Sequence, residues 1–226
     1  MADFDVIAAG AGNAAFPAAV SARESGAKRV LVLEKAPRAQ RGGNTHFSRA
    51  IFRFAFDDVA DIKYLVPGAA EKYRGFDGVN GVQPYPYSAF HEDLMKVTQG
   101  RSDPELSDVL IANSRDTVMW VHDVGGVQME LATSVMGIRV GDQIKWPKGA
   151  IVRAVHEGVG LSSTWFRTAE KLGIDIRYET GARALVQDAR GRVTGVVVNG
   201  PDGLQTLKAK GIVLACGRFE TNPAWR

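Results

Sequence analysis

Residues 5–15 read DVIAAGAGNAA, a mostly apolar run that leads into a glycine-rich turn. Residues 5–9 predict a buried parallel strand, because β-favouring apolar residues lead directly into that turn. Gly10 permits a tight reversal, and Gly12 lets a phosphate approach the backbone without a β-carbon in the way. Ala15 takes the third small position, which keeps a following helix close to the strand. The stretch therefore predicts a dinucleotide-binding α/β fold.

The next residues complete a strand, helix and strand unit. Small and apolar residues recur at helical spacing over 13–25, and Gly26 stands where a left-handed residue would end the helix. Residues 30–33 read VLVL and predict the second strand. Glu34 follows it, at the place where a carboxylate accepts hydrogen bonds from ribose hydroxyls and repels the 2′-phosphate of NADP.

Two further loops favour FAD over NAD. The sequence RGGNT at 41–45 follows Glu34 closely, and its paired glycines leave backbone amides accessible to a phosphate or a flat ring. Residues 212–217 read IVLACG, an apolar strand whose turn would lie beside the first glycine loop. An NAD-binding domain requires neither addition, although an ordinary loop remains the alternative for 41–45.

The rest of the chain predicts an α/β architecture. Helices are expected from Ser88 to Gly100, from Asp103 to about Gly125, and after Gly160 up to Gly173, while 53–87 shows no period and predicts a long surface excursion. Short strands at 175–178, 182–187, 193–198 and 204–208 predict a small antiparallel meander, followed by a last strand at 212–215. We therefore expect residues 1–226 to form a Rossmann-like FAD-binding domain with a parallel sheet and a small antiparallel β-meander.

Composition narrows the function. The 226 residues include one cysteine, Cys216, so an internal disulfide and a thiolate zinc site are excluded and a reducing compartment is favoured. The net charge of +3 comes from dispersed residues, so we expect no nucleic-acid partner. We expect no signal peptide and no membrane span, because no suitable apolar run occurs, and we place the protein in the cytoplasm.

These motifs carry a resemblance to a known family. In their order along the chain they resemble the flavoprotein subunits of fumarate reductase and succinate dehydrogenase. Within that family, four stretches are most similar to the tricarballylate dehydrogenases: 34–37 (EKAP), 41–44 (RGGN), 96–98 (KVT) and 169–173 (AEKLG). The resemblance implies hydride exchange between flavin N5 and a carbon next to a carboxylate of a small di- or tricarboxylic acid. It is also compatible with an electron-acceptor protein as partner.

The resemblance also implies the cofactor contacts. Covalent members carry histidine one place before the loop threonine, whereas this chain has Asn44 there and His46 after Thr45, which implies noncovalent FAD. The late strand is often followed by two glycines, but here Arg218 replaces the second. The cofactor residues expected are Gly10, Gly12, Asn13, Ala14, Ala15, Glu34, Lys35, Arg41, Gly42, Gly43, Asn44, Thr45, Ala184, Ala215, Cys216 and Gly217.

Substrate contacts have weaker support. Arg49 and Arg53 follow the second loop at spacings that, with His46, could put two of the three side chains on one helical face, and arginine suits carboxylates. Surface arginines are the alternative. His156 precedes a glycine pair in a segment that the family places near flavin and substrate, and a solvated loop is its alternative. The tryptophans predict core packing, and no catalytic acid and no metal ligand can be named.

The end of the chain favours a second interpretation. Asn222 and Pro223 resemble a helix cap and first turn with no helix after them. In the relatives, a capping domain and a return to the flavin domain follow this point. We therefore also expect a partial, inactive FAD- or NAD-binding fragment as the alternative to a dehydrogenase.

Overall fold

The structure is a computed structural model that describes residues 2–73, 75–77, 81–146 and 149–217. Arg218 and the capping sequence at Asn222 lie outside the described residues. The chain divides into two compact units, one formed by Met1–Ser48 with Gly158–Arg226 and the other by Arg49–Glu157. We call them unit 1 and unit 2 and describe each by itself.

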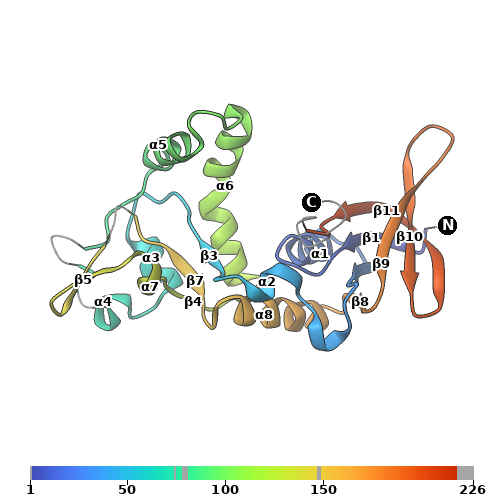
Figure 1. The fold of residues 1–226 in the computed structure, drawn as a ribbon, viewed down its shortest axis with the longest axis horizontal. Coiled ribbons are helices and arrows are strands. Elements are labelled where there is room, and N and C mark those ends of the chain that lie inside the picture. Colours follow the sequence, from blue (N-terminus) through green and yellow to red (C-terminus); the bar gives the residue numbers. More distant parts are fainter. Residues whose placement is uncertain (1, 74, 78–80, 147–148, 218–226) are drawn as a thin grey trace. The chain divides into compact units, whose positions relative to one another are not determined.

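Unit 1 is built on a six-stranded sheet in the order β8-β2-β1-β11-β10-β9 (Figure 1). Its strands are β1 (Phe4–Ala9), β2 (Val30–Leu33), β8 (Asp175–Arg177), β9 (Gly181–Gln187), β10 (Val193–Gly200) and β11 (Gly203–Leu214). The first four strands of the order are parallel, whereas β10 and β9 are antiparallel additions. The predicted fold class is confirmed. Strands β1 and β2, which precede and follow the glycine turn and α1, lie where the sequence predicts them.

The helices of unit 1 are α1 (Ala15–Glu24), a 3-10 turn (Arg38–Gln40), α2 (Gly43–Phe47) and α8 (Glu157–Lys171). Helix α1 connects β1 to β2, and Gly26 follows it with a φ of +92°, as expected of a left-handed helix end. Phe16 of α1 packs edge-to-face on Phe166 of α8, with 4.6 Å between ring centres. The sheet core includes Ile7, Leu31 and Val196.

The predicted meander is wrong in two respects. Strand β8 joins the parallel sheet beside β2, and β11 is one continuous strand where we expected two. Its first half pairs antiparallel with β10 and its second half pairs parallel with β1. Residues 208–211 read KAKG and look like a break in the sequence, but Lys208 donates its amide to Asp3 and Lys210 forms an ion pair with Asp5. Neighbouring carboxylates thus keep this polar stretch within the sheet.

Asp5 ties three segments of unit 1 together. Its Oδ2 accepts hydrogen bonds from the amides of Lys28 and Arg29 at 3.0 and 2.9 Å, and its Oδ1 lies 2.8 Å from Lys210 Nζ. The Lys210 ammonium and the Arg29 amide hold the pKa of Asp5 well below its usual range.

We predict that Asp5→Asn lowers the thermal midpoint of the protein at neutral pH. Because the folded-state pKa is depressed, the carboxylate stabilises the fold fully above its unfolded pKa of about 3.9 and loses that effect as the pH falls towards the folded value. The difference between wild type and variant should therefore narrow below about pH 4. Thermal unfolding from pH 7 to pH 2 measures it, with Asp202→Asn in the exposed β10–β11 turn as control. A difference independent of pH would contradict the role of Asp5.

Unit 2 contains most of the helices. They are α3 (Ala60–Leu65), α4 (Ala69–Lys72), α5 (Tyr87–Thr98), α6 (Pro104–Asp123) and α7 (Thr133–Met136). Its strands are β3 (Ile51–Phe52), β4 (Met129–Leu131), β5 (Ile138–Val140), β6 (Gln143–Lys145) and β7 (Val152–Ala154), arranged as β3-β7-β4 and β5-β6. The Asp103 side chain accepts the Leu106 amide, so the predicted cap of α6 is confirmed.

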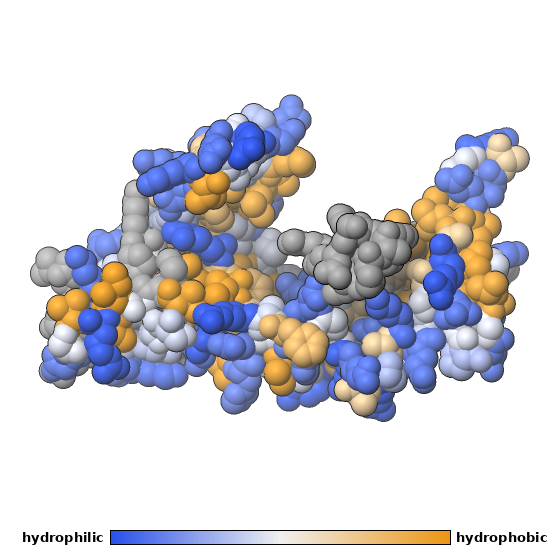
Figure 2. Space-filling view, in the orientation of Figure 1, coloured by the Kyte–Doolittle hydropathy of each residue, from blue (hydrophilic) through white to orange (hydrophobic). Residues whose placement is uncertain are grey.

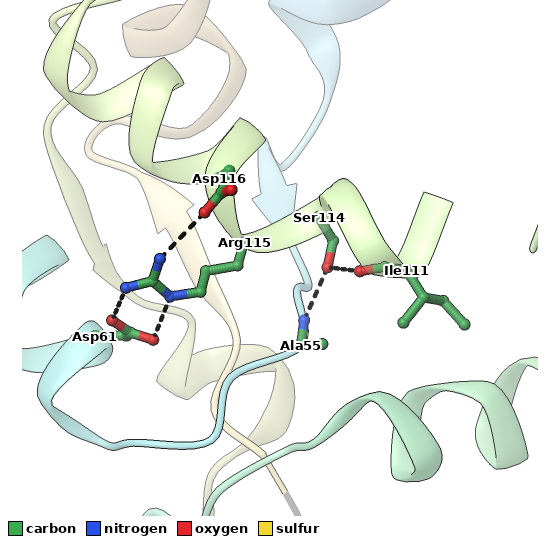
Figure 3. Close-up of polar contacts among 6 residues, drawn as sticks. All are labelled: Ala55, Asp61, Ile111, Ser114, Arg115 and Asp116. Atoms are coloured by element: carbon green, nitrogen blue, oxygen red, sulfur yellow. Dashed lines mark hydrogen bonds and ion pairs between the residues drawn. The ribbon is translucent and has the colours of Figure 1, made fainter. Parts of the chain in front are cut away.

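The predicted surface excursion at 53–87 is wrong. Phe54, Phe56, Phe76 and Tyr85 are all buried and form much of the core of unit 2. Helix α6 also anchors this segment through polar contacts (Figure 3). Arg115 binds both carboxylate oxygens of Asp61 at 2.6 and 2.7 Å, and Ser114 Oγ accepts the Ala55 amide at 2.9 Å. Helices α3 and α4 are too short to show a period in the sequence.

Some apolar side chains remain on the surface. Figure 2 shows a group of them over the region of β9–β11, where the exposed residues include Leu185, Leu204 and Leu214. Exposed apolar residues on α6 include Leu106 and Val109. None of the helices within the described part of the chain combines the length and the apolar character that a membrane crossing needs.

Candidate functional site

The glycine turn between β1 and α1 is shaped by the end of β11. Gly10 has a φ of +118°, and a β-carbon there would overlap the carbonyl oxygen of Ala215. The Ala215 amide donates to Ala9 O at 2.9 Å, which fixes the end of β11 against the end of β1. The late Ala-Cys-Gly turn therefore lies beside the first glycine loop, as the sequence predicts.

The second loop also meets the glycine turn. Thr45 of α2 accepts the Asn13 amide through its Oγ1 at 2.9 Å, and an ideal β-carbon on Gly12 would lie 3.1 Å from the same oxygen. Thr45 thus holds the backbone of the turn at the start of α1. Three segments that are distant in sequence, at Gly10–Asn13, Thr45 and Ala215, are brought together at the carboxyl end of β1.

Glu34 lies at the end of β2 and is only 6% exposed. Its Oε1 accepts the Ala36 amide at 2.9 Å, and its Oε2 accepts the Gly42 amide at 3.1 Å. The carboxylate therefore folds residues 35–42 over the end of β2. Each carboxylate oxygen has a second lone pair, so these bonds leave acceptor capacity for ribose hydroxyls.

The turn offers hydrogen-bond donors to an anion. The amides of Ala11, Gly12 and Ala14 donate to no partner among the residues that the structure describes. They lie at or just before the N-terminus of α1, where the helix dipole also favours negative charge. Unpartnered amides, a helix start and a turn with glycine at positions 10 and 12 fit the pyrophosphate of a dinucleotide.

Helix α8 contacts both loops, the glycine turn through Trp165 and the second loop through Gly158 and Ser162, and the sequence did not reveal these contacts. A β-carbon on Gly42, whose φ is +99°, would overlap Ser162 Oγ, and one on Gly158 would overlap the carbonyl oxygens of Thr45, His46 and Ser48. The helix predicted to follow the glycine pair begins instead at Glu157, because Gly158 is required for packing and does not break the helix. Spacing of 158, 162 and 165 along one helical face is the signal that could have shown this contact.

The remaining predicted cofactor residues are more dispersed. The Arg41 guanidinium lies 4.3 Å from the centre of the Phe166 ring and donates to Tyr178. Gly181, at the start of β9, lies against Lys35. Ala184 is an exposed residue of β9, paired with Val197 of β10, so β10 and β11 separate its strand from β1. Four further candidates are exposed, namely Gly43 and Asn44 at the start of α2 and Cys216 and Gly217 just after β11.

Comparison with known proteins agrees with this geometry. The sequence matches the family described as FAD binding domain over residues 5–74 and 85–226. The chain belongs to this family. It is 30% identical to a fumarate reductase (cytochrome) of Shewanella frigidimarina over 96% of this chain and 34% of that protein. A urocanate reductase of Eggerthella lenta is 28% identical over 99% of this chain and 33% of that protein.

Solved structures show the same fold. The open conformation of a flavocytochrome c3 fumarate reductase has a TM-score of 0.67 and 26% identity, covering 93% of this chain and 33% of that one. A 3-ketosteroid-Δ4-(5α)-dehydrogenase of Rhodococcus jostii has a TM-score of 0.72 at 23% identity, covering 99% and 48%. The family match and the fumarate reductase relatives confirm the resemblance to the fumarate reductase and succinate dehydrogenase flavoproteins, and FAD is the cofactor of this fold. The chain spans about a third of the length of the curated relatives described here.

The substrate candidates of this FAD-binding chain lie in unit 2. Arg49 and His156 are exposed, whereas Arg53 lies 3.2 Å from Asp93 and 4.2 Å from the centre of the Tyr85 ring. The expected helical spacing is wrong, because α2 ends at Phe47 and Arg53 follows β3. Burial and the hydrogen bond to Asp93 raise the pKa of Tyr85 to about 12, so Tyr85 remains a neutral donor in this cluster.

Proposed function

We propose that the chain binds FAD noncovalently and belongs to an oxidoreductase that exchanges hydride with a small di- or tricarboxylic acid similar to tricarballylate. Bound FAD would supply the hydride chemistry. The residues of unit 1 hold the cofactor, and Arg49, Arg53 and His156 are the candidates for substrate contact. Cys216, Gly217 and Ala184 remain proposed cofactor contacts.

The observation that carries the proposal is the meeting of the three loops. Asn13 and Thr45 are hydrogen-bonded, Glu34 accepts the Gly42 amide, and Ala215 lies against Gly10. A lone glycine turn fits any dinucleotide, whereas the two additional loops favour a flavin. The confirmed family supports this choice of cofactor over NAD.

The substrate class rests on the relatives and on charge. The relatives are named as reductases of fumarate and urocanate, and both of these substrates carry a carboxylate beside a carbon-carbon double bond. Arginine and histidine suit such anions. An electron-acceptor protein and a cytoplasmic location complete the proposal, the latter supported by the single cysteine.

We predict that added FAD binds the purified protein and that binding quenches the flavin fluorescence until one equivalent is bound. NAD should not displace the bound FAD. Acid precipitation should release the flavin into the supernatant, because Asn44 replaces the histidine of covalent members. Displacement by NAD would contradict the cofactor assignment, and flavin retained in the pellet would contradict noncovalent attachment.

The same preparation tests the substrate class. Tricarballylate, succinate and fumarate should perturb the bound-flavin spectrum, whereas the monocarboxylate propionate, the matched control, should not. Equal perturbation by propionate would contradict recognition of more than one carboxylate.

A further inference from the structure

Trp165 makes a specific contact with the glycine turn. Its side chain is fully buried in α8, and its indole Nε1 donates a hydrogen bond to Asn13 Oδ1 at 2.8 Å. Asn13 is the first residue after the Gly-Ala-Gly sequence of the turn. A tryptophan distant in sequence therefore reaches the segment that faces the expected pyrophosphate.

The contact determines how the side-chain amide of Asn13 is oriented. An indole nitrogen donates and cannot accept, so the Asn13 atom that faces it is the oxygen. The Asn13 nitrogen Nδ2 then lies on the other side of the amide group. It donates to no partner within the described residues. The side chain thus has one end fixed and a donor end available.

The backbone of Asn13 is fixed as well. Its amide donates to Thr45 Oγ1 at 2.9 Å, so neither the backbone nor the side chain can rotate without losing a hydrogen bond. If the side-chain amide of Asn13 were free to flip, it would present Oδ1 to the phosphate about as easily as Nδ2. A flip would also break the hydrogen bond from the buried Trp165 N–H to Asn13, which is costly.

We propose that Trp165 is a positioning residue that presents Asn13 Nδ2 as a side-chain donor to the FAD pyrophosphate, beside the amides of Ala11, Gly12 and Ala14. The inference rests on the proposed FAD binding. Preorganisation is the physical benefit, because a donor already held in place loses no side-chain entropy when the anion binds. The substitution Asn13→Asp would keep the bond from Trp165 but present a second, charged oxygen to the phosphate.

The experiment measures FAD affinity by fluorescence titration for Trp165→Phe, Asn13→Ala, the double variant and Asn13→Asp. Each of the first two should weaken binding about 10-fold to 150-fold, the scale of one hydrogen bond to a charged group. The double variant should be no weaker than Asn13→Ala, because Trp165 acts through Asn13. Asn13→Asp should bind most weakly, and its deficit should shrink as salt is added.

Competition separates this role from a merely structural one. ADP contains the pyrophosphate and adenosine does not, so the variants should weaken displacement of FAD by ADP and leave the adenosine affinity unchanged. Trp146→Phe, a buried tryptophan of unit 2, is the matched control and should leave FAD and ADP affinity unchanged.

Additive losses in the double variant, or equal losses for ADP and adenosine, would overturn the inference. If Trp165→Phe does not fold, the comparison of Asn13→Ala with Asn13→Asp still tests the donor, since equal affinities would refute it. Wild-type protein that binds no FAD would refute the proposed function, whereas unchanged FAD affinity in the variants would refute this inference alone.

Discussion

Gly10→Ala is expected to abolish measurable FAD binding and to destabilise unit 1 by on the order of 3 kcal/mol. The residue has a φ of +118°, where an alanine is strained, and its β-carbon would overlap the backbone oxygen of Ala215. A backbone atom cannot rotate away as a side chain can, so β11 must shift relative to β1. Because the shift separates two of the three loops, the affinity for FAD should fall by at least about 100-fold.

Gly26→Ala is the matched control for this prediction. Gly26 also has a positive φ, of +92°, but a β-carbon there meets nothing within 4 Å. It should cost about 1 kcal/mol from backbone strain and leave FAD affinity unchanged. Chemical denaturation and fluorescence titration measure both quantities. Wild-type affinity in Gly10→Ala would show that the turn and the end of β11 do not form one site.

Glu34→Ala is expected to weaken FAD binding by about 1 to 3 kcal/mol and to destabilise the segment that follows β2. The two amides bound by the carboxylate, from Ala36 and Gly42, would lose a charged acceptor in a buried position. The ribose hydroxyls would lose the same acceptor. Titration with FAD measures the first effect, and proteolysis within 35–42 detects the second.

One further substitution tests the carboxylate at this position, and a second removes an exposed carboxylate elsewhere as the control. Glu34→Gln keeps the shape, but both carboxylate oxygens face amide donors, so its nitrogen must meet one of them and we expect a similar loss. Glu170→Ala removes an exposed partner of Arg38 at 3.5 Å and should change stability by less than about 0.5 kcal/mol. Unchanged FAD affinity in Glu34→Ala would remove Glu34 from the site.

The unit around the glycine turn was largely predictable. Strands β1 and β2, helix α1 and Gly26 all depend on local signals, namely apolar runs, small residues and a left-handed glycine. The cap at Asp103 is equally local. Such elements follow from backbone preferences and short-range periodicity, which a sequence displays directly.

Unit 2 was poorly predicted between 53 and 87. Its core aromatics, such as Phe54 and Tyr85, occur at irregular spacing, and α4 has only four residues. Buried positions in short, irregular segments are decided by which other segments pack on them. The helical face expected to carry two of His46, Arg49 and Arg53 was wrong for a similar reason, because the chain enters β3 soon after α2 ends.

The sequence by itself determined the cofactor turn, the acidic end of β2 and the class of fold, because each depends on neighbouring residues and their conformational limits. Only the tertiary structure decided that β11 is one strand paired with both β1 and β10, since Asp3 and Asp5 compensate its polar centre. It alone showed that Trp165 and Ser162 of α8 contact the two glycine loops. Contacts between segments so distant in sequence depend on how helices and strands pack, which no local pattern encodes.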